Sequence, residues 1–412
     1  MPQNKKGITK MGLIVQKYGG TSVKDAERVM NVARRITDAY KAGNNVVVAV
    51  SAQGDTTDDL IEKAKEINPS ASKREMDMLL STGEQISISL LAMAIEKLGY
   101  PVISLTGWQA GFKTDSKYGS ARIKTIDTER LQMELDRRRI VIVAGFQGLN
   151  KYDDITTLGR GGSDTSAVAL AAALHADVCE IYTDVDGVYT TDPRICSRAY
   201  KLDEISYDEM LELASLGANV LHNRSVEMAK KYNVKLSVRS SLNNNEGTYV
   251  KEDSQVEKML VRGVARDNDC ARIALCGVED APGKAFQVFE MIAKEGISVD
   301  LIIQSIGDGK SKDISFTVAE ADLEPTLKLL EANNDFIKAR EIKSSSDVAK
   351  VSIVGAGMVN NSGVAAKMFE ALSDAHINIK MIATSEIKIS VLVAQKDAEN
   401  AVIAIHDKFL SK

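Results

Sequence analysis

Cysteine and histidine are scarce in this sequence, with four of each among 412 residues. Cys179, Cys196, Cys270 and Cys276 show no paired spacing, and the histidines are scattered. A disulfide framework and a zinc site are therefore not expected, and we predict no metal site built by the protein alone. Sparse, unpaired cysteines are typical of a reducing compartment, so we expect a cytoplasmic protein.

Long hydrophobic runs and an excess of positive charge are also missing. No run of about 18 apolar residues occurs, and the basic segment Met1–Lys10 has no apolar core, so neither a membrane anchor nor a signal peptide is expected. The net charge of −5 argues against broad electrostatic binding of nucleic acid. With 44% hydrophobic and 26% charged residues, the composition is that of a soluble globular enzyme of two to three domains.

Short apolar strands alternate with amphipathic helices from Leu13 to about Val238. This alternation predicts a mostly parallel sheet that helices cover on both faces, with ligands beyond the carboxyl ends of the strands. The expected strands are Ile14–Lys17, Val46–Ser51, Val102–Leu105, Ile140–Ala144, Val178–Thr183 and Leu236–Arg239. The expected helices are Ala26–Ala42, Arg74–Leu98, Thr128–Arg138 and Ser166–Leu174.

Two glycine-rich segments, Lys17–Ser22 and Gly159–Asp164, stand next to expected helices, and each contains a cation. The first directly follows a strand, and the second comes just before a helix. Backbone N–H groups, a helix N-terminus and a positive side chain together form an anion clamp. Two such clamps in one domain predict that two anionic molecules meet there.

Lys17 and Arg160 are the cations of these two segments. Gly19 and Gly20 let the backbone approach a polyphosphate while the Lys17 ammonium reaches its terminal oxygens, although a surface lysine beside a tight turn is the plainer alternative. The Arg160 guanidinium suits bidentate capture of a carboxylate. Asp164 orients Lys17, contacts a magnesium-bearing phosphate, or simply caps the following helix.

Three further segments place polar side chains near strand or helix ends. Glu84, which follows Gly83 in a long apolar helix, is equally well interpreted as an ammonium acceptor or as a solvated glutamate. Ser51–Asp58 offers hydroxyls and turn amides to an anion, or is an ordinary polar loop. Thr183–Arg194 offers groups for a ribose, a base and a phosphate, or forms a simple turn, since the other ligands of an EF-hand loop are missing.

One glycine pattern has the form of a dinucleotide fingerprint without its context. Val354–Met358 follows a strand, but the third glycine comes late, at Gly363, and no second βαβ half follows. A Rossmann site is therefore not expected. The GxxxxGK[ST] spacing of a P-loop is also absent from the sequence, so an ATP-dependent enzyme here would be of another type.

Beyond a polar linker near Asn243–Gly247, the sequence repeats with a shift of 80 positions. Each copy is expected to be βαββα with a leading or following strand, close to the lower size limit of a free-standing core. We therefore expect the two copies to pack sheet to sheet, within one chain or across a dimer. The repeated residues are Gly283, Phe289, Ile297 and Ser305, which recur as Gly363, Phe369, Ile377 and Ser385.

Lys17–Ser22, Ser81–Glu84, Gly159–Asp164 and Thr183–Arg194 together resemble the motifs of the aspartokinases, a branch of the amino acid kinase family, in the same order. The C-terminal repeat is similar to the tandem ACT domains of that branch. The resemblance implies an α/β chain with a three-layer αβα amino acid kinase fold and a mostly parallel central sheet, followed by two ferredoxin-like βαββαβ ACT domains. The implied divisions are a catalytic domain at 11–245, a linker at 246–265, and ACT domains at 266–342 and 343–412. No dehydrogenase module follows, so the monofunctional type is expected.

The resemblance implies ATP-dependent phosphorylation of the β-carboxylate of L-aspartate to 4-phospho-L-aspartate, the first step toward lysine, threonine and methionine. A carboxylate nucleophile needs no strong general base, so positioning and charge neutralisation by Lys17 and Mg²⁺ would suffice. The implied catalytic residues are Lys17 and Asp164. The implied substrate-binding residues are Ser51, Thr56, Glu84, Arg160, Gly161 and Ser163. The implied nucleotide-binding residues are Lys17, Tyr18, Gly19, Gly20, Thr183, Asp184, Tyr189 and Arg194.

The ACT resemblance implies feedback by lysine, threonine or both at an interface between ACT domains, and a homo-oligomer assembled through them. The implied effector residues are Asp300, Gln304, Ser305, Asn378, Ile379, Thr384, Ser385 and Glu386. The alternative is that these residues merely end strands at a dimer contact. One position departs from the family: Asn219 stands where a lysine is common, so we expect nucleotide binding to depend more on Arg194.

Three other functions are also compatible with parts of this sequence. Another amino acid kinase, acting on N-acetylglutamate or glutamate, is the runner-up, and the tandem repeat and Glu84 favour aspartate over it. A non-catalytic amino-acid sensor would need none of the intact Lys17, Arg160 and Asp164. A NAD-linked dehydrogenase would rest on the incomplete fingerprint alone.

Overall fold

The computed structural model describes residues 12–217, 220–252, 260–305, 311–358 and 361–411. The chain divides into two compact units. The first comprises Met1–Val188, Lys201–Ala214 and Asn219–Ser254, and the second comprises Tyr189–Tyr200, Ser215–Ala218 and Gln255–Lys412.

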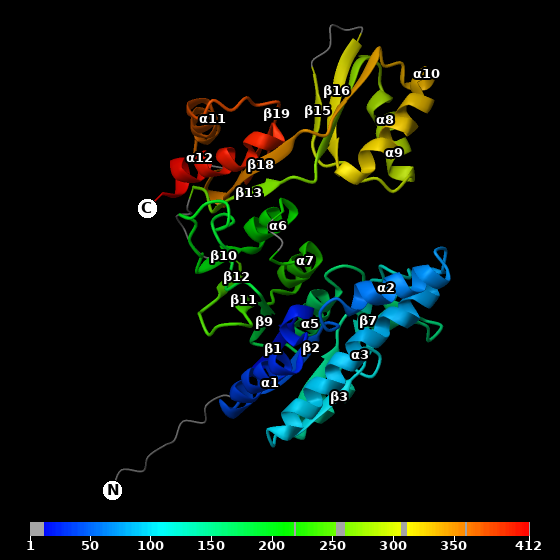
Figure 1. Cartoon of the computed structure of the whole chain (residues 1–412), viewed down its shortest axis with the longest axis vertical. Helices are drawn as coiled ribbons and strands as arrows, with labels where there is room; N and C mark the ends of the chain where they lie inside the picture. Colours follow the sequence, from blue (N-terminus) through cyan, green and yellow to red (C-terminus); the bar gives the residue numbers. More distant parts are fainter. Residues whose placement is uncertain (1–11, 218–219, 253–259, 306–310, 359–360, 412) are drawn as a thin grey trace. The chain divides into compact units, whose positions relative to one another are not determined.

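The first unit is built on an eight-stranded sheet of order β10-β12-β11-β9-β1-β2-β6-β3 (Figure 1). Neighbouring strands pair in parallel, except β11 with β12. The mostly parallel sheet and all six expected strands are thus confirmed. The strands are β1 (Leu13–Tyr18), β2 (Asn45–Val50), β3 (Val102–Leu105), β6 (Ile140–Ala144), β9 (Val178–Thr183), β10 (Glu204–Ser206), β11 (Leu236–Ser240) and β12 (Thr248–Lys251).

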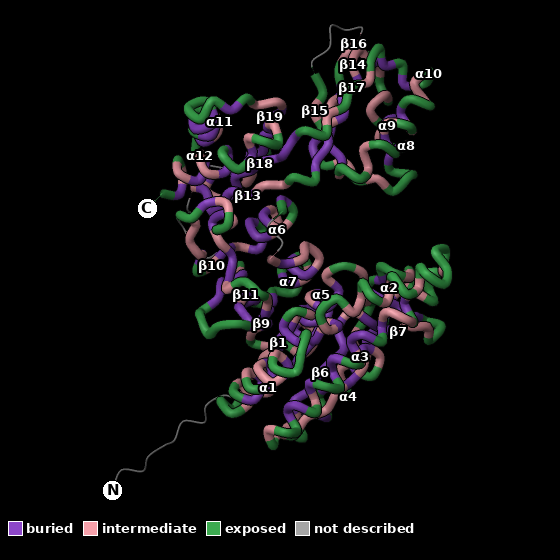
Figure 2. Tube along the Cα trace, viewed as in Figure 1, coloured by how far each residue is buried: buried purple, intermediate pink, exposed green. Residues whose placement is uncertain are grey.

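Helices cover both faces of this sheet. Helix α1 (Ala26–Lys41) and helix α3 (Lys73–Lys97) share one hydrophobic core with Tyr18 and the alternate residues of β2 and β6. Helix α5 (Gly162–Ala173) packs on β1, β2 and β9 and against helix α7 (Asn223–Tyr232). Because neighbouring residues of a strand point to opposite faces, Tyr18 faces α1 and α3 while Lys17 faces α5. Strands β2 and β6 are buried almost along their whole length, and β1 is half-buried (Figure 2).

Helix α3 is, by length and composition alone, apolar enough to cross a membrane, a test that core helices also pass. It instead packs against α1, β3, β6 and the small strand β8 (Ile155–Thr157). Its buried face carries Ser81, Glu84 and Ser87 beside Ile88 and Leu91. The buried face accounts for part of the apolar composition, while Ile86, Leu90 and Met93 of the same helix are exposed.

Several elements of the first unit were not expected from the sequence. Helix α2 (Thr56–Ile67) stands where a polar loop was one of the two interpretations of 51–58. Leu60, Ile61, Ala64 and Ile67 recur in it at helical spacing, but none of its residues is buried. Helix α5 begins at Gly162 rather than at Ser166, because its polar first turn carries no helical periodicity. Helix α4 (Glu129–Asp136) confirms the helix expected at Thr128–Arg138. The other unexpected elements are α6 (Tyr207–Ser215) and a small sheet of order β5-β4-β7-β8 formed by β4 (Phe112–Thr114), β5 (Ile123–Ile126), β7 (Gln147–Leu149) and β8.

The second unit contains two small antiparallel sheets, one for each copy of the repeat. The first sheet has the order β15-β16-β14-β17, and the whole copy is βαββαβ as expected. Its elements are β14 (Ala271–Glu279), α8 (Lys284–Lys294), β15 (Ile302–Gln304), β16 (Ser311–Val318), α9 (Leu323–Ala332), α10 (Asn334–Ile337) and β17 (Glu341–Ser345). Gly283, with φ 89°, opens α8.

The second copy takes its outer strand from before the first copy. Its sheet has the order β13-β18-β20-β19, in which β13 (Gly263–Asp267) pairs antiparallel with β18. Gly363, also with φ 89°, opens α11 and so confirms its correspondence with Gly283. The other elements are β18 (Ala349–Val354), α11 (Val364–Asp374), β19 (Met381–Thr384), β20 (Lys388–Val393) and α12 (Ala398–Leu410).

The expected linker at 246–265 contains regular structure at both of its ends. Thr248–Lys251 forms β12 of the main sheet, and Gly263–Asp267 begins the sheet of the second repeat copy. The chain therefore leaves one sheet and enters the other with a shorter connection than the sequence suggested. The domain divisions themselves remain predictions.

Candidate active site

A cavity of about 270 Å³ lies in the first unit where β1 and β2 end. The two strand ends are joined by a hydrogen bond from the Ser51 backbone N–H to the Tyr18 carbonyl, at 3.1 Å. The carboxyl ends of parallel strands are the usual place for ligands in such sheets. The cavity is lined by Lys17, Gly20, Ser51, Ala52, Gly54, Thr57, Glu84, Phe146, Gly159, Arg160, Gly161, Gly162, Ser163 and Asp164. The expectation that Lys17 and Arg160 share one pocket is confirmed.

Lys17 and Asp164 form an ion pair in the wall of this cavity. The Lys17 Nζ lies 2.7 Å from Asp164 Oδ1, and the two side chains are only 13% and 14% exposed. Lys17 comes from β1 and Asp164 from the first turn of α5, where the free N–H groups of the helix favour a negative charge. The pair holds the ammonium at the cavity, which agrees with the expectation that Asp164 orients Lys17.

The turn before α5 can be formed only by glycine at position 161. Gly161 has φ 66°, and a Cβ there would lie 2.2 Å from Cγ of His222. The Gly162 N–H donates to the Gly159 carbonyl at 3.0 Å, which closes the turn. The helix therefore begins directly at the cavity, and the N–H groups of its first turn have no partner within the helix. Such a helix start is suited to an anion.

The first glycine segment is equally close-packed. A Cβ on Gly20 would lie 2.6 Å from the Ala52 carbonyl oxygen. The Gly54 N–H donates to the Gly20 carbonyl at 3.1 Å, so the turns after β1 and β2 meet backbone to backbone. A larger side chain at position 20 would separate the two turns that frame the cavity.

Glu84 presents a buried carboxylate to the cavity. The residue is 3% exposed, its Oε1 accepts a hydrogen bond from the Ala52 N–H at 3.1 Å, and its buried Oε2 has no hydrogen-bond partner in the described chain. Burial raises the pKa of Glu84 to about 8. The interpretation as a solvated helix glutamate is therefore wrong. Gly83 lets α3 approach this closely, because a Cβ there would lie 2.8 Å from the Ala52 Cβ.

Asp77 ties α3 to the strand that leads into the Arg160 turn. This carboxylate is 1% exposed and accepts from the backbone N–H groups of Gly119 and Thr157, each at 2.9 Å, and from the Thr157 hydroxyl at 2.7 Å. Asp77 lies about two helical turns before Glu84, so both side chains are on the same side of α3. Burial raises the pKa of Asp77, and these hydrogen bonds oppose that shift. One buried carboxylate thus links the elements that carry Glu84 and Arg160.

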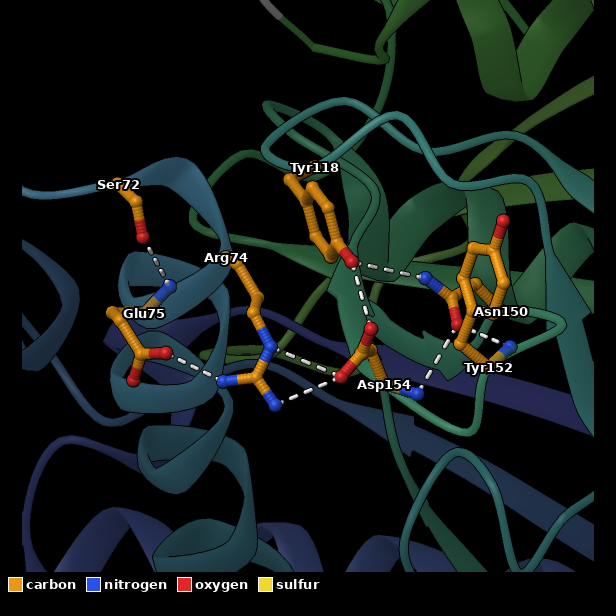
Figure 3. A network of polar contacts seen from close by, with 7 residues as sticks. All are labelled: Ser72, Arg74, Glu75, Tyr118, Asn150, Tyr152 and Asp154. Carbon is orange, nitrogen blue, oxygen red and sulfur yellow. Dashed lines mark hydrogen bonds and ion pairs between the residues drawn. The ribbon is translucent and has the colours of Figure 1, made fainter.

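A second, exposed network ties the start of α3 to the β7–β8 turn (Figure 3). Arg74 donates to Asp154 Oδ1 through Nε at 3.0 Å and Nη2 at 2.8 Å, and the Tyr118 hydroxyl donates to Asp154 Oδ2 at 2.8 Å. Asn150 Oδ1 accepts from the backbone of Tyr152 and of Asp154, which shapes the turn. The Tyr118 and Arg74 contacts lower the pKa of Asp154. Because this network faces solvent, it contributes less to stability than the buried Asp77 contacts.

Two of the expected ligands do not face the cavity with their side chains. The Tyr18 ring is fully buried on the opposite face of the sheet, stacked on Tyr182 with ring centroids 4.7 Å apart. Only the main chain of Tyr18 can therefore contact a ligand. The Thr56 hydroxyl donates to the Gln53 carbonyl at 2.6 Å, and it is the neighbouring Thr57 that lines the cavity.

The residues after β9 that were expected to contact the nucleotide belong to two different units. In the first unit, the Thr183 hydroxyl donates to Asp184 Oδ1 at 3.0 Å. Tyr189 and Arg194 belong to the second unit. The Arg194 side chain is exposed and donates to the Asp192 carboxylate, with Nη2 2.7 Å from Oδ2. Asn219 lies outside the described residues. The roles of these residues remain predictions.

Ala52, Gly54 and Thr57, from the segment expected to offer hydroxyls and turn amides, also line the cavity, whereas sequence reasoning missed Phe146. Phe146 follows β6 and has φ 70°, a conformation that costs a bulky residue free energy and is often retained at functional sites. Its backbone N–H donates to the Ser166 hydroxyl at 3.0 Å. The strand-end rule could have found it, because Gly145 and Phe146 directly follow an expected strand at the same edge of the sheet.

The expected effector residues lie in the second unit. Asp300 forms an ion pair with Lys350, whose side chain is 4% exposed and which also lies 3.1 Å from Asp267. Ile379 packs against the hydrophobic core of the second repeat copy. The others are exposed at or near strand ends: Gln304, Ser305, Asn378, Thr384, Ser385 and Glu386. Their exposure is compatible with effector binding and equally with a protein contact.

Comparisons with known proteins agree with this architecture. The profile of the amino acid kinase family matches residues 12–240, and that of the ACT domain matches residues 273–333 and again 351–409. The chain is 53% identical over 400 residues to the aspartokinase of Bacillus sp. (strain MGA3), covering 97% of both chains. It is 52% identical to aspartokinase 2 of Bacillus subtilis (strain 168), covering 98% of this chain and 99% of the relative.

Solved structures show the same likeness. The crystal structure of E. coli aspartokinase III in complex with aspartate and ADP, described as the R-state, superposes with a TM-score of 0.79 at 27% identity, covering 96% of this chain and 99% of that one. The complex of the same enzyme with lysine and aspartate, described as the T-state, gives 0.77, covering 97% and 99%. The expected fold of a parallel-sheet kinase domain and two ACT domains is confirmed, and the chain belongs to the aspartokinases of the amino acid kinase family.

Proposed function

We propose that this chain transfers the γ-phosphoryl group of ATP to the β-carboxylate of L-aspartate, forming 4-phospho-L-aspartate under feedback control. The observation that carries this proposal is the meeting of Lys17, Arg160 and the buried Glu84 in one cavity. Two cations and one carboxylate complement the charges of a phosphate donor and an amino-acid acceptor. The aspartate and ADP bound by the E. coli relative are of the same two classes.

The free oxygen of Glu84 is the proposed acceptor for the α-ammonium group of aspartate. An ammonium there would stabilise the ionised carboxylate and offset the burial that raises its pKa. Arg160 would bind the α-carboxylate with two parallel hydrogen bonds, and Ser163 and the backbone at Gly161 would support it. Ser51 and Thr56 are the other proposed substrate-binding residues. Thr56 would act indirectly, because its hydroxyl stabilises the turn after β2. N-acetylglutamate carries no ammonium, so it would leave Glu84 unpaired.

Lys17 is the proposed stabiliser of the transferring phosphoryl group, with the N–H groups of Gly19 and Gly20 beside it. Asp164 keeps the Lys17 ammonium in place through their 2.7 Å ion pair, so it need not reorganise during transfer. The acceptor carboxylate is already ionised at neutral pH and requires no general base. The rate then depends on in-line placement of the two substrates.

Mg²⁺ is the proposed metal, carried in by the nucleotide. Among the described residues that line the cavity, the carboxylates are Glu84 and Asp164, and Asp164 is already paired with Lys17. This donor set is too small for a cage built by protein alone, and it fits an ion that keeps phosphate and water ligands. When bound, Mg²⁺ neutralises charge on the transferring phosphates. The proposed nucleotide contacts are the backbone of Tyr18 and the residues Thr183, Asp184, Tyr189 and Arg194.

We propose further that lysine, threonine or both act at the ACT domains through the eight effector residues named above, and that the chain forms a homo-oligomer through these domains. The four cysteines are free thiols, which suits a cytoplasmic enzyme. The proposed division is the one expected from the sequence, with the catalytic domain at 11–245 and ACT domains at 266–342 and 343–412.

An ADP-release assay with aspartate, glutamate or N-acetylglutamate as acceptor tests the proposal. Turnover with aspartate alone supports it, and addition of lysine or threonine should then lower the rate. Preferred turnover of glutamate or N-acetylglutamate would show that the enzyme phosphorylates another class of acceptor. Binding of lysine without any turnover would favour an amino-acid sensor.

A further inference from the structure

Three side chains of metal-binding type meet in the second unit, although they are far apart in the sequence. Cys196 belongs to the segment Tyr189–Tyr200, while His406 and Asp407 are neighbours on α12. Cys196 Sγ lies 3.7 Å from His406 Nδ1, and one ligand atom from each of the three residues lies within 4.8 Å of the others. Cys196 is 2% exposed and His406 is fully buried.

Neighbouring residues orient two of these ligands from behind. The second ring nitrogen of His406, Nε2, forms a 2.9 Å hydrogen bond with the Thr190 hydroxyl, so Nδ1 is the nitrogen that faces the sulfur. Asp407 Oδ2 accepts a 2.5 Å hydrogen bond from Arg198. Bonds of this kind fix the ring orientation and the carboxylate plane at metal sites in proteins.

The second carboxylate oxygen of Asp407 is the atom that most directly indicates a missing ligand. Asp407 Oδ1 is inaccessible to solvent and has no hydrogen-bond partner in the described chain. A buried oxygen without a partner is costly, and in native proteins it usually indicates a missing water or ion. The Asp407 side chain as a whole is 33% exposed, so the cluster lies close to the protein surface.

The ligand types and their spacing favour zinc or a similar divalent ion. Zinc binds sulfur at about 2.3 Å and nitrogen at about 2.0 Å, so tetrahedral geometry separates the two ligand atoms by about 3.5 Å. The observed separation of 3.7 Å between Sγ and Nδ1 is close to this value. Mg²⁺ and Ca²⁺ prefer oxygen ligands throughout and are a poorer match to this set.

We propose that Cys196, His406 and Asp407 bind one thiophilic divalent cation of the zinc class, with water in the fourth position. On binding, the Cys196 thiol releases its proton to solvent and coordinates as thiolate, while neutral His406 coordinates through Nδ1. The ion would link the segment Tyr189–Tyr200 to α12 of the second ACT copy. None of the three ligands lines the proposed catalytic cavity, and the site does not depend on the proposed activity.

Titration of the chelator-treated full-length protein with Co²⁺, followed by displacement with Zn²⁺, tests the site. We expect a thiolate-to-cobalt charge-transfer absorption that saturates at one equivalent per chain and disappears when Zn²⁺ is added. Cys196→Ser should abolish this absorption. Cys276→Ser, which changes a cysteine on β14 in the first ACT copy, is the matched control and should retain it. Absence of the absorption in the unchanged protein, or its persistence in Cys196→Ser, overturns the proposal.

A second variant tests the site independently, in case Cys196→Ser does not fold. Asp407→Asn keeps the shape of a partly exposed side chain and weakens only its exposed ion pair with Arg198, so the metal-free protein should lose little stability. Its affinity for Zn²⁺, measured by competition with a chromophoric chelator, should fall at least about 10-fold, since even residues behind the ligands matter by that factor. An unchanged affinity would remove Asp407 from the site and contradict the three-ligand assignment.

Discussion

At the scale of single residues, Glu84 makes substrate binding depend on pH. Its pKa of about 8 means that the carboxyl group is mostly protonated in the ligand-free protein at pH 7, whereas an ammonium binds the ionised form. We expect the KM for aspartate to fall as pH rises from about 7 toward the Glu84 pKa. Initial rates measured over a pH series would show this fall. In Glu84→Gln this dependence should vanish and the KM should be higher throughout. A KM in this variant equal to that of the original protein would remove Glu84 from the substrate site.

The same residue predicts an opposite trend for stability. The folded-state pKa of Glu84 is raised from the model-peptide value of 4.5, so between these values the folded state holds a proton that the unfolded state has lost. The contribution of this group is therefore present at low pH and is lost as pH rises toward 8. Urea unfolding of the ligand-free protein should show a loss on the order of 2 kcal/mol between pH 6 and 9, and Glu84→Gln should lack most of it.

Lys17 should affect the rate of phosphoryl transfer more than the binding of either substrate. Lys17→Met removes the ammonium that faces the transferring group, and we expect kcat to fall at least about 100-fold, as for other lost electrostatic contacts to a transition state. Lys24→Met is the matched control, because Lys24 is an exposed lysine in the adjoining segment and does not line the cavity. Near-normal turnover in Lys17→Met would reject the proposed role.

At the scale of elements, the start of α5 depends on Gly161. Gly161→Ala combines an unfavourable φ of 66° with a Cβ placed 2.2 Å from His222, so the turn must shift. We expect loss of turnover together with a lowered melting temperature. Gly99→Ala separates the two causes, because Gly99 has φ 85° and nothing within 4 Å of the added Cβ. That variant should lose about 1 kcal/mol of stability and keep its kinetic constants.

The link between α3 and β8 predicts a selective effect on one substrate. Asp77→Asn places an amide where two N–H groups and a hydroxyl now donate, so the elements that carry Glu84 and Arg160 should shift relative to each other. We expect the KM for aspartate to rise about 10-fold, equivalent to about 1.4 kcal/mol, with the KM for ATP little changed. Asp154→Asn, in the exposed network of Figure 3, should change either constant less than about twofold. Equal effects on both KM values would indicate general loosening.

At the scale of the whole molecule, the sequence predicted the central sheet well because β2 and β6 are buried on both faces and read as nearly unbroken apolar runs, and the other strands alternate with helices around them. The two glycine turns could be predicted because their backbone geometry excludes other residues. Helix α2 was missed although Leu60, Ile61, Ala64 and Ile67 recur at helical spacing. Phe146 could have been found only from its place after an expected strand, because its left-handed backbone leaves no compositional trace. The contact between Cys196 and His406 could not be predicted either, because contacts between distant segments depend on the tertiary fold.

Regulation is also a property of the whole chain. Asp300→Ala and Glu386→Ala should raise the concentration of lysine or threonine needed for half-inhibition without lowering the uninhibited rate, because neither residue lies in the catalytic unit. Asp300→Ala also removes one of the two carboxylates around Lys350, which retains Asp267. Inhibition curves that coincide with those of the original protein in both variants would exclude these positions from effector binding.

The strand β13 makes the second ACT copy discontinuous, and the first copy is inserted between β13 and β18. During synthesis on the ribosome, β13 emerges first and must wait for its partner strand β18 until the entire first copy has been translated. The second copy can therefore complete its sheet only after closure of a long loop, whereas the first can fold from contiguous chain. A fragment that starts at residue 343 would leave one edge of β18 open to pairing with other chains, which makes aggregation its expected fate.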